Sequence, residues 1–176
     1  MPVMTGLSGN EIYCLRLKGL APGDLVIGNS VFSMGFLGGI GAGFRGMVGG
    51  EIQQLTSVIH EGRLEAYKRM VSEASQRGAI GISGVTNELR QFHGQTEFLS
   101  VASSVHRQEA PAGTQESIEF TTSANGQELY CQLDAGFRPI RFVFGNIAYS
   151  VGVAGGLLGG LKSLARGSDP HSTFPD

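Results

Sequence analysis

Apolar residues recur at the helical period between Glu51 and Arg77. They lie three or four residues apart with charged residues between them, which predicts a long amphipathic helix with one buried face. Gly78 follows as the expected C-terminal cap. Two favourable i, i+4 pairs support the helix. The predicted buried stripe is Ile52, Leu55, Ile59, Gly62, Ala66, Met70 and Ala74, and the pairs are Glu65 with Arg69 and Glu73 with Arg77.

Elsewhere in the chain, strict alternation of apolar and polar residues, or a short continuous apolar run, predicts strands. The first two strands are expected to form a hairpin, with a bulge or bend at Gly28-Asn29. A polar loop is expected between the third strand and the fourth. The predicted strands are Glu11 to Lys18, Asp24 to Ser33, Ala79 to Thr86, Glu97 to Arg107 and Glu116 to Thr122.

The chain contains an internal repeat. Residues 9–50 return at 126–167 with a constant offset of 117 and no gap, and 15 of the 42 positions are identical. Such a repeat predicts one supersecondary element that packs against its own copy. The identical positions include Glu11/Glu128, Tyr13/Tyr130, Cys14/Cys131, Gly28/Gly145 and Asn29/Asn146.

The end of each repeat is rich in glycine at spacings of three or four residues, which predicts a short helix with a glycine stripe. Because each glycine costs up to about 1 kcal/mol of helix propensity, such a helix needs close contact with another backbone. We therefore interpret a set of glycines as candidate packing positions between helices or subunits. They are Gly35, Gly39, Gly43, Gly62, Gly152, Gly156 and Gly160.

These elements predict an α+β fold, with an antiparallel sheet, one long amphipathic helix and short Gly-rich helices. The second repeat would add a duplicated strand-strand-helix half. The main break in the pattern is the segment from Gln108 to Thr114, which contains Pro111 and Gly113. We expect a first unit at 1–110, the half-repeat at 111–167 packed on it, and a flexible tail at 168–176.

Composition narrows the classes of function. With 13 basic and 15 acidic residues in 176, the chain has no basic excess that would predict nucleic-acid binding. The N-terminus does not have the pattern of a secretory signal, which favours a cytoplasmic location. Cys14 and Cys131 are then expected to be reduced thiols on the inward faces of strands, with a disulfide between them as the less favoured alternative. The low share of charged residues, 16%, hints at surface buried between subunits.

The order of the elements, together with Gly28, the FRGMVGG junction, the Arg63 to Arg69 part of the helix and the passage RGAIGISGV, resembles the bacterial YbjQ-like family. The resemblance covers about residues 7–107. It implies a dodecin-like α+β unit that assembles into a pentameric ring, and the family carries a heavy-metal-binding label. The half-repeat departs from the family pattern and leaves the number of subunits open.

The metal label is weakly supported by the residues, because cysteines and histidines are not closely paired. The best local set is His60, Glu61 and Glu65, with Glu88, His93 and Glu97 around the predicted loop; His60, Glu61 and His93 are the candidate ligands. Solvated surface is the competing interpretation of these residues. We expect no cofactor, with a metal ion as the open alternative.

No motif predicts catalysis. Gly41, Gly43 and Gly46 form G-x-G-x-x-G, but inside a predicted helix and not at the strand-to-helix turn that a dinucleotide requires. GGLKS near Lys162 does not match a phosphate-binding loop, and the cysteines have no neighbouring histidine in the sequence. We therefore expect a protein that is not an enzyme.

Two uncharged stretches of 20 residues, Leu25 to Phe44 and Phe142 to Leu161, are long enough to span a bilayer and contain G-x-x-x-G spacings. Glycine, serine and asparagine dilute their hydrophobicity, and the first half of each has a strand pattern. The favoured hypothesis is therefore a self-assembling homo-oligomer, of pentamer type, that acts as a scaffold or binding module. The alternatives are an oligomer that binds a metal ion or small ligand, and a membrane-associated assembly.

Overall fold

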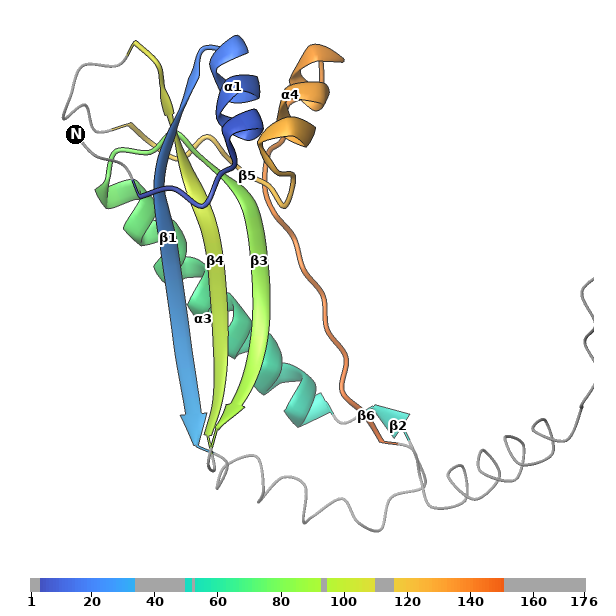
Figure 1. The fold of residues 1–176 in the computed structure, drawn as a ribbon. Helices are drawn as coiled ribbons and strands as arrows, with labels where there is room; N and C mark the ends of the chain where they lie inside the picture. Colours follow the sequence, from blue (N-terminus) through green and yellow to red (C-terminus); the bar gives the residue numbers. More distant parts are fainter. Residues whose placement is uncertain (1–3, 34–49, 52, 93–94, 110–115, 151–176) are drawn as a thin grey trace, which may run out of the picture.

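The structure, a computed structural model, describes residues 4–33, 50–51, 53–92, 95–109 and 116–150. The described residues form an α+β fold in which the long helix α3 lies against one face of a four-stranded mixed sheet (Figure 1). The elements are α1 Gly9–Leu17, β1 Leu20–Ser33, β2 Gly50–Glu51, α3 Gln53–Gln76, β3 Gly81–Phe92, β4 Gln95–Arg107, β5 Phe120–Thr121, α4 Gly126–Asp134 and β6 Tyr149–Ser150.

The sheet has the strand order β1-β4-β3-β5. Strands β1 and β3 each pair antiparallel with the central strand β4, whereas β5 pairs parallel with β3 through two residues. The strand expected over Glu116 to Thr122 is therefore shortened to Phe120–Thr121. β2 and β6 form a separate two-stranded ladder, which joins the end of the described second repeat to the residues before α3.

The first element of each repeat is a helix, and the predicted strand at Glu11 to Lys18 is wrong. In α1, the Ser8 side chain accepts a hydrogen bond from the Glu11 backbone, and the Glu11 side chain bonds the Ser8 backbone in return. Asn125 and Glu128 do the same for α4. This reciprocal capping satisfies N–H groups that an uncapped helix would leave free. The capping box therefore outweighs the apparent alternation, and the predicted hairpin does not form.

Glu11 also joins the two repeats. Its Oε2 accepts from the Ser8 backbone at 2.7 Å, while its Oε1 accepts from the Gly126 backbone at the start of α4, at 3.2 Å. Gly126 is needed there, because a Cβ at this position would lie 2.7 Å from the Cβ of Glu11. The two helices pack side by side at one end of the sheet, where Leu15 and Leu129 join Leu20, Ile80 and Val105 in a buried cluster (Figure 1).

The predicted long helix is confirmed, from Gln53 to Gln76, with Gly62, Ala66, Met70 and Ala74 buried. Gly78 ends it at φ 72°, with the Gly78 N–H bonded to Ser75 and the Ala79 N–H bonded to Ala74. This pair of bonds is a Schellman motif, and its left-handed residue favours glycine. Both predicted ion pairs on the helix, Glu65–Arg69 and Glu73–Arg77, are present.

Two glycines let α3 lie close to the sheet. A Cβ at Gly28 of β1 would overlap the Ala66 carbonyl oxygen and the Met70 nitrogen, and a Cβ at Gly62 of α3 would meet the Phe98 ring. Gly62, in the predicted buried stripe, is thus the point where the central strand β4 lies against the helix. The expected irregularity at Gly28-Asn29 is wrong, because the register is continuous there and shifts between Pro22 and Leu25 instead. Gly28 is required for helix contact, not for a bulge.

Strands β3 and β4 form a long hairpin, whereas the sequence predicted a short strand and a polar loop. Thr86 to Phe92 continue β3 in register with β4, after an irregularity between Ser83 and Thr86. Most of these residues are exposed, so the polar pattern reflects an uncovered surface and not a break in the strand. Residues 93–94, between the two strands, lie outside the described residues.

Both predicted Gly-rich helices lie outside the described residues, apart from Gly50, and so does most of the predicted break at Gln108 to Thr114. Within the ranges that are described, no helix is long and apolar enough to cross a membrane.

We predict that Gly28→Ala destabilises the fold by about 2 kcal/mol or more, because its Cβ would press on the backbone of α3. Urea unfolding followed by circular dichroism, at one fixed protein concentration, measures the loss. Gly9→Ala is the control, since nothing lies within 4 Å of a Cβ at that position. Equal unfolding midpoints for both variants would contradict the close contact between β1 and α3.

The link through Glu11 predicts a pH-dependent contribution to stability. Partial burial acts to raise the pKa of Glu11, but hydrogen bonds from Ser8 and from the Gly126 backbone outweigh it and hold the pKa below the usual value of a glutamate carboxyl. A lowered carboxyl pKa stabilises the fold above the unfolded pKa, and this contribution is lost as the pH falls through the folded pKa.

Glu11→Gln should therefore lower the unfolding midpoint at pH 7, and its difference from wild type should shrink below about pH 4.5. Glu128→Gln is the matched control, because its carboxylate caps α4 but has no bond to the described residues of the other repeat. A larger loss in the control than in Glu11→Gln would exclude the proposed link between α1 and α4.

Candidate functional site

The second repeat leaves α4 and becomes an extended segment, residues 137–150, that runs alongside α3 without joining the four-stranded sheet (Figure 1). Gly136, at φ 84°, turns the chain out of the helix. The segment is fixed near its start by Thr121, whose N–H donates to the Ile140 carbonyl and whose hydroxyl accepts from the Phe142 N–H. This segment, which we call the edge segment, is the candidate functional site.

One side of the edge segment packs against α3. The rings of Phe142 and Phe144 lie beside Tyr67, and the Tyr67 hydroxyl hydrogen-bonds Thr121 at 2.8 Å. The guanidinium of Arg63 lies 5.0 Å from the centre of the Phe144 ring and bonds the Gly145 carbonyl. These aromatic and cation–π contacts give the segment a defined position on the helix.

Further along, Thr56 of α3 forms two bonds with the edge segment. Its carbonyl accepts from the Asn146 side chain and its hydroxyl accepts from the Ala148 N–H, both at 2.9 Å. The ladder between β6 and β2 then ends the described segment. The inward residues Phe142, Phe144, Asn146 and Ala148 therefore alternate with residues that point away from α3.

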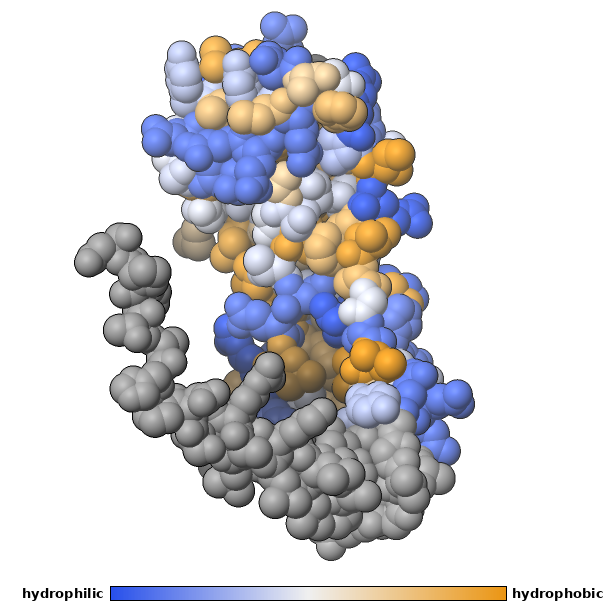
Figure 2. Space-filling view, turned by 90° about the vertical axis from the view of Figure 1, so that its right-hand side faces the viewer, coloured by the Kyte–Doolittle hydropathy of each residue, from blue (hydrophilic) through white to orange (hydrophobic). Residues whose placement is uncertain are grey.

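The outward side of the edge segment is apolar and exposed. Val143 is 81% exposed, and Ile147 and Tyr149 are each 66% exposed. Figure 2 shows hydrophobic residues interspersed with hydrophilic ones on the side of the molecule that carries this segment. The outward side begins with Arg141, which has no ion-pair partner within the described part of the chain.

The positions on the outward side of the edge segment are exposed, whereas the equivalent positions of the first repeat face α3. Positions 26, 28, 30 and 32 of β1 face α3, and all but the partly covered Phe32 are buried. Their equivalents, at an offset of 117, are Val143, Gly145, Ile147 and Tyr149, which are exposed. Gly28 meets helix backbone, yet nothing lies within 4 Å of a Cβ at Gly145. The side that is covered in the first repeat is therefore uncovered in the second.

A second uncovered surface lies on the sheet face opposite α3. Near α1 both faces of β4 are buried, but from Gln95 to Ala102 only alternate residues are. The residues on the uncovered side of this part form what we call the open sheet face. They are Ile27, Asn29 and Val31 of β1, Glu97, Leu99 and Val101 of β4, and Thr86, Glu88, Arg90 and Phe92 of β3.

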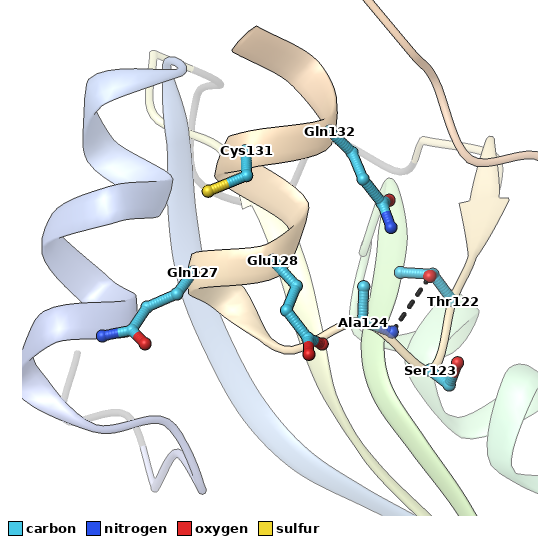
Figure 3. Close-up of a pocket in the computed structure, with 7 residues that line it drawn as sticks. All are labelled: Thr122, Ser123, Ala124, Gln127, Glu128, Cys131 and Gln132. Atoms are coloured by element: carbon cyan, nitrogen blue, oxygen red, sulfur yellow. Dashed lines mark hydrogen bonds between the residues drawn. The ribbon is translucent and has the colours of Figure 1, made fainter. Parts of the chain in front are cut away.

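Two adjoining grooves of about 500 and 330 Å³ lie beside α4 and share Thr122, Ser123 and Gln132. In the larger groove, Gln132 and Glu128 point toward the turn at Thr122, while Cys131 and Gln127 project on the side of α1 (Figure 3). The Glu128 carboxylate is engaged by the Asn125 backbone at 2.9 Å. No basic residue lines the larger groove, so the Cys131 thiol lacks the positive neighbour that activates a nucleophile.

The cysteines do not occupy the positions that the sequence predicted. Both lie on helices, and Cys131 is exposed while Cys14 is partly exposed, because Leu15 and Leu129 take the buried positions. Both thiols are free, so the alternative of a disulfide between them is wrong. The expectation of inward-facing residues failed together with the predicted strands.

The candidate metal ligands are spread over the surface. His60 is exposed with its ring 5.6 Å from Phe144, Glu61 is exposed, and Glu65 pairs with Arg69. Glu97 accepts a hydrogen bond from Asn29, and His93 lies outside the described residues. Over the ranges that the structure covers, no three His, Cys, Asp or Glu side chains come together as a metal site.

Of the candidate packing glycines, only Gly62 is described, and it is buried against Phe98 within the chain rather than between subunits. Gly35, Gly39, Gly43, Gly152, Gly156 and Gly160 lie outside the described residues. The sequence analysis did not identify the edge segment as a site. The available signal was the repeat itself, since the sequence of β1 returns at residues 137–150.

The architecture is that of a small α+β unit in which one long helix covers an antiparallel three-stranded core. Residues 20–105 match the family described as "Putative heavy-metal-binding". A UPF0145 protein of Paraburkholderia phymatum is 35% identical over 83 residues, which are 47% of this chain and 75% of that protein. The UPF0145 protein of Methanococcus vannielii is 35% identical over 82 residues, 46% of this chain and 78% of that protein. The chain belongs to this family, the YbjQ-like or UPF0145 proteins.

A further relative aligns beyond the family region. "Encapsulin nanocompartment protein Rv1762c" of Mycobacterium tuberculosis (strain ATCC 25618 / H37Rv) is 33% identical over 156 residues, 85% of this chain and 57% of that protein. The UPF0145 protein of Sulfurisphaera tokodaii is 39% identical over 70 residues, 38% of this chain and 61% of that protein. The aligned region thus spans less than two thirds of each of these two relatives.

We predict that Cys131 reacts with iodoacetamide faster than Cys14, because its side chain is more exposed on α4. Intact mass spectrometry after short exposures measures the rate, and Cys131→Ser, which leaves Cys14 alone, is the control. Burial of both thiols in the native protein, with labelling only in urea, would contradict the assignment of these residues to exposed helices.

Proposed function

We propose that this protein is a self-assembling, non-enzymatic module that acts as a homo-oligomeric scaffold. The observation that carries the proposal is the exposed apolar side of the edge segment. Three large apolar side chains, Val143, Ile147 and Tyr149, lie exposed on this one side, and exposed apolar surface that is grouped in this way commonly marks an interaction site. Burial between subunits would remove this surface from water at a gain of about 25 cal/mol per Å².

The arrangement of the uncovered surfaces favours a ring. The edge segment lies on the β3 and β5 side of α3, whereas the exposed Ile27 and Val31 belong to β1 at the opposite edge of the sheet. An interface between two different patches is heterologous and generates a ring when its rotation closes. The pentamer expected from the family resemblance is one such closed ring.

The relatives support an assembly role and give no catalytic assignment. The mycobacterial relative, whose alignment extends past the family region, bears the name of a nanocompartment protein. A scaffold that works as part of a larger assembly agrees with that name. Metal uptake has less support, because the described residues bring together no cluster of three ligands.

Native mass spectrometry in detergent-free buffer should give a discrete multiple of the 18.5 kDa chain, with five or ten subunits expected. The reason is that apolar burial at each contact outweighs the entropy lost on closing the ring. The measurement is repeated over a dilution series, with metal analysis of untagged protein alongside. A monomer at all concentrations would refute the assembly, and stoichiometric bound metal would favour the ligand-binding alternative.

A further inference from the structure

We propose that the outward side of the edge segment, from Arg141 to Tyr149, docks on the open sheet face of a second copy of this chain. The inference rests on the proposed homo-oligomer and names the two surfaces that meet in it. Each copy then offers a donor surface and an acceptor surface, so each binds two neighbours.

The residues of the donor surface are suited to contact with this chain's own elements. In the first repeat, the equivalent side packs on α3 of the same chain, and Gly28 permits backbone contact there. The second repeat keeps Gly145 at that position, although the space around it is empty in the single chain. Among the described residues the one long helix, α3, packs on the other side of the edge segment, so the outward side is free to contact another molecule.

The charges of the two surfaces are complementary. Residues 136–150 contain Arg138 and Arg141 and no acidic residue, whereas the open sheet face contains Glu88, Glu97 and Arg90. Arg90 pairs with Glu88, and Glu97 bonds only the neutral Asn29 side chain. Glu97 lies directly across from Arg90 in the ladder, but Arg90 is engaged by Glu88, so among the described residues the Glu97 carboxylate has no ion-pair partner. It is flanked by Val31 and Leu99, which match an apolar partner.

The partner surface is the face of the sheet and not the edge of β1. The Leu25 N–H donates to the Met4 carbonyl, the Ile27 N–H donates to Glu73, and Arg69 donates to the Asn29 carbonyl. These contacts occupy the groups that an added strand would need. Docking across the face leaves them intact and covers Ile27, Val31 and Phe92, which are 48%, 53% and 52% exposed.

Charge reversal tests the contact. Arg141→Glu and Glu97→Arg should each weaken assembly at least about tenfold, because each brings like charges together at the interface. The double variant Arg141→Glu/Glu97→Arg restores opposite charges and should regain the wild-type mass. Native mass over a dilution series is the readout, and circular dichroism verifies that each variant is folded. Lys68→Glu, on the exposed side of α3, controls for the change in net charge.

A second pair of variants removes apolar contact without relying on charge pairing. Val143→Asp should dissociate the assembly, whereas Met4→Asp, at the same 81% exposure but outside both surfaces, should not. If the wild type is itself a monomer, the proposed function fails. If the wild type assembles but Val143→Asp and the single charge variants leave the oligomer intact, the homo-oligomer is supported and this docking is wrong. The same conclusion follows if the double variant fails to restore the assembly. Another surface or another partner would then cover the edge segment.

Discussion

The contact between the backbone of β1 and the backbone of α3 sets the geometry of the whole unit. Gly28 lies directly under Ala66 and Met70, and Gly62 makes room for Phe98 on the central strand. With the helix this close, Arg69 and Glu73 reach the edge of β1 and engage backbone groups there. The contact therefore positions the buried stripe and also closes an edge that would otherwise be open to another strand.

The other flank of α3 depends on the same placement. Because the helix lies over β1 and β4, its Tyr67, Arg63 and Thr56 face the second repeat and hold the edge segment. The segment has a strand's alternation, but along residues 144–148 it bonds α3, and it meets strands only at Thr121 of β5 and in the short ladder with β2. The helix α3 thus contacts two related sequences, β1 and the edge segment, through different sides. The side that carries Gly28 is covered in β1, whereas the side that carries Gly145 is exposed in the edge segment. This asymmetry leaves the outward side of the second repeat exposed.

The family is described as heavy-metal-binding, but the described residues of this chain do not form a metal site. A heavy-metal site needs closely placed thiolate, imidazole or carboxylate groups. Here Glu65 is engaged by Arg69, Glu97 bonds Asn29 and His60 lies against an aromatic ring. Each has a structural neighbour of its own. What the described residues present instead is an exposed surface of apolar side chains and a few charges.

Local pattern determined a large part of the fold. The helical period of the stripe from Gly62 to Ala74, with its ion pairs and glycine cap, is set by residues within a few turns of one another, so the sequence was sufficient for α3. The same holds for the cores of β1, β3 and β4. For α1 and α4 the sequence also held the answer, in the capping residues Ser8 with Glu11 and Asn125 with Glu128, but the apparent alternation led to strands.

Only the tertiary structure decided which side of each repeat is covered. Val26 and Val143 are identical residues in equivalent positions, and a period of two cannot distinguish the side that meets α3 from the side that meets water. That choice depends on where one helix lies relative to two strand sequences that are 117 residues apart. Burial depends on how the whole chain packs. The repeat therefore determined the alternation of residues in the edge segment, and the position of α3 determined which side of that segment is exposed.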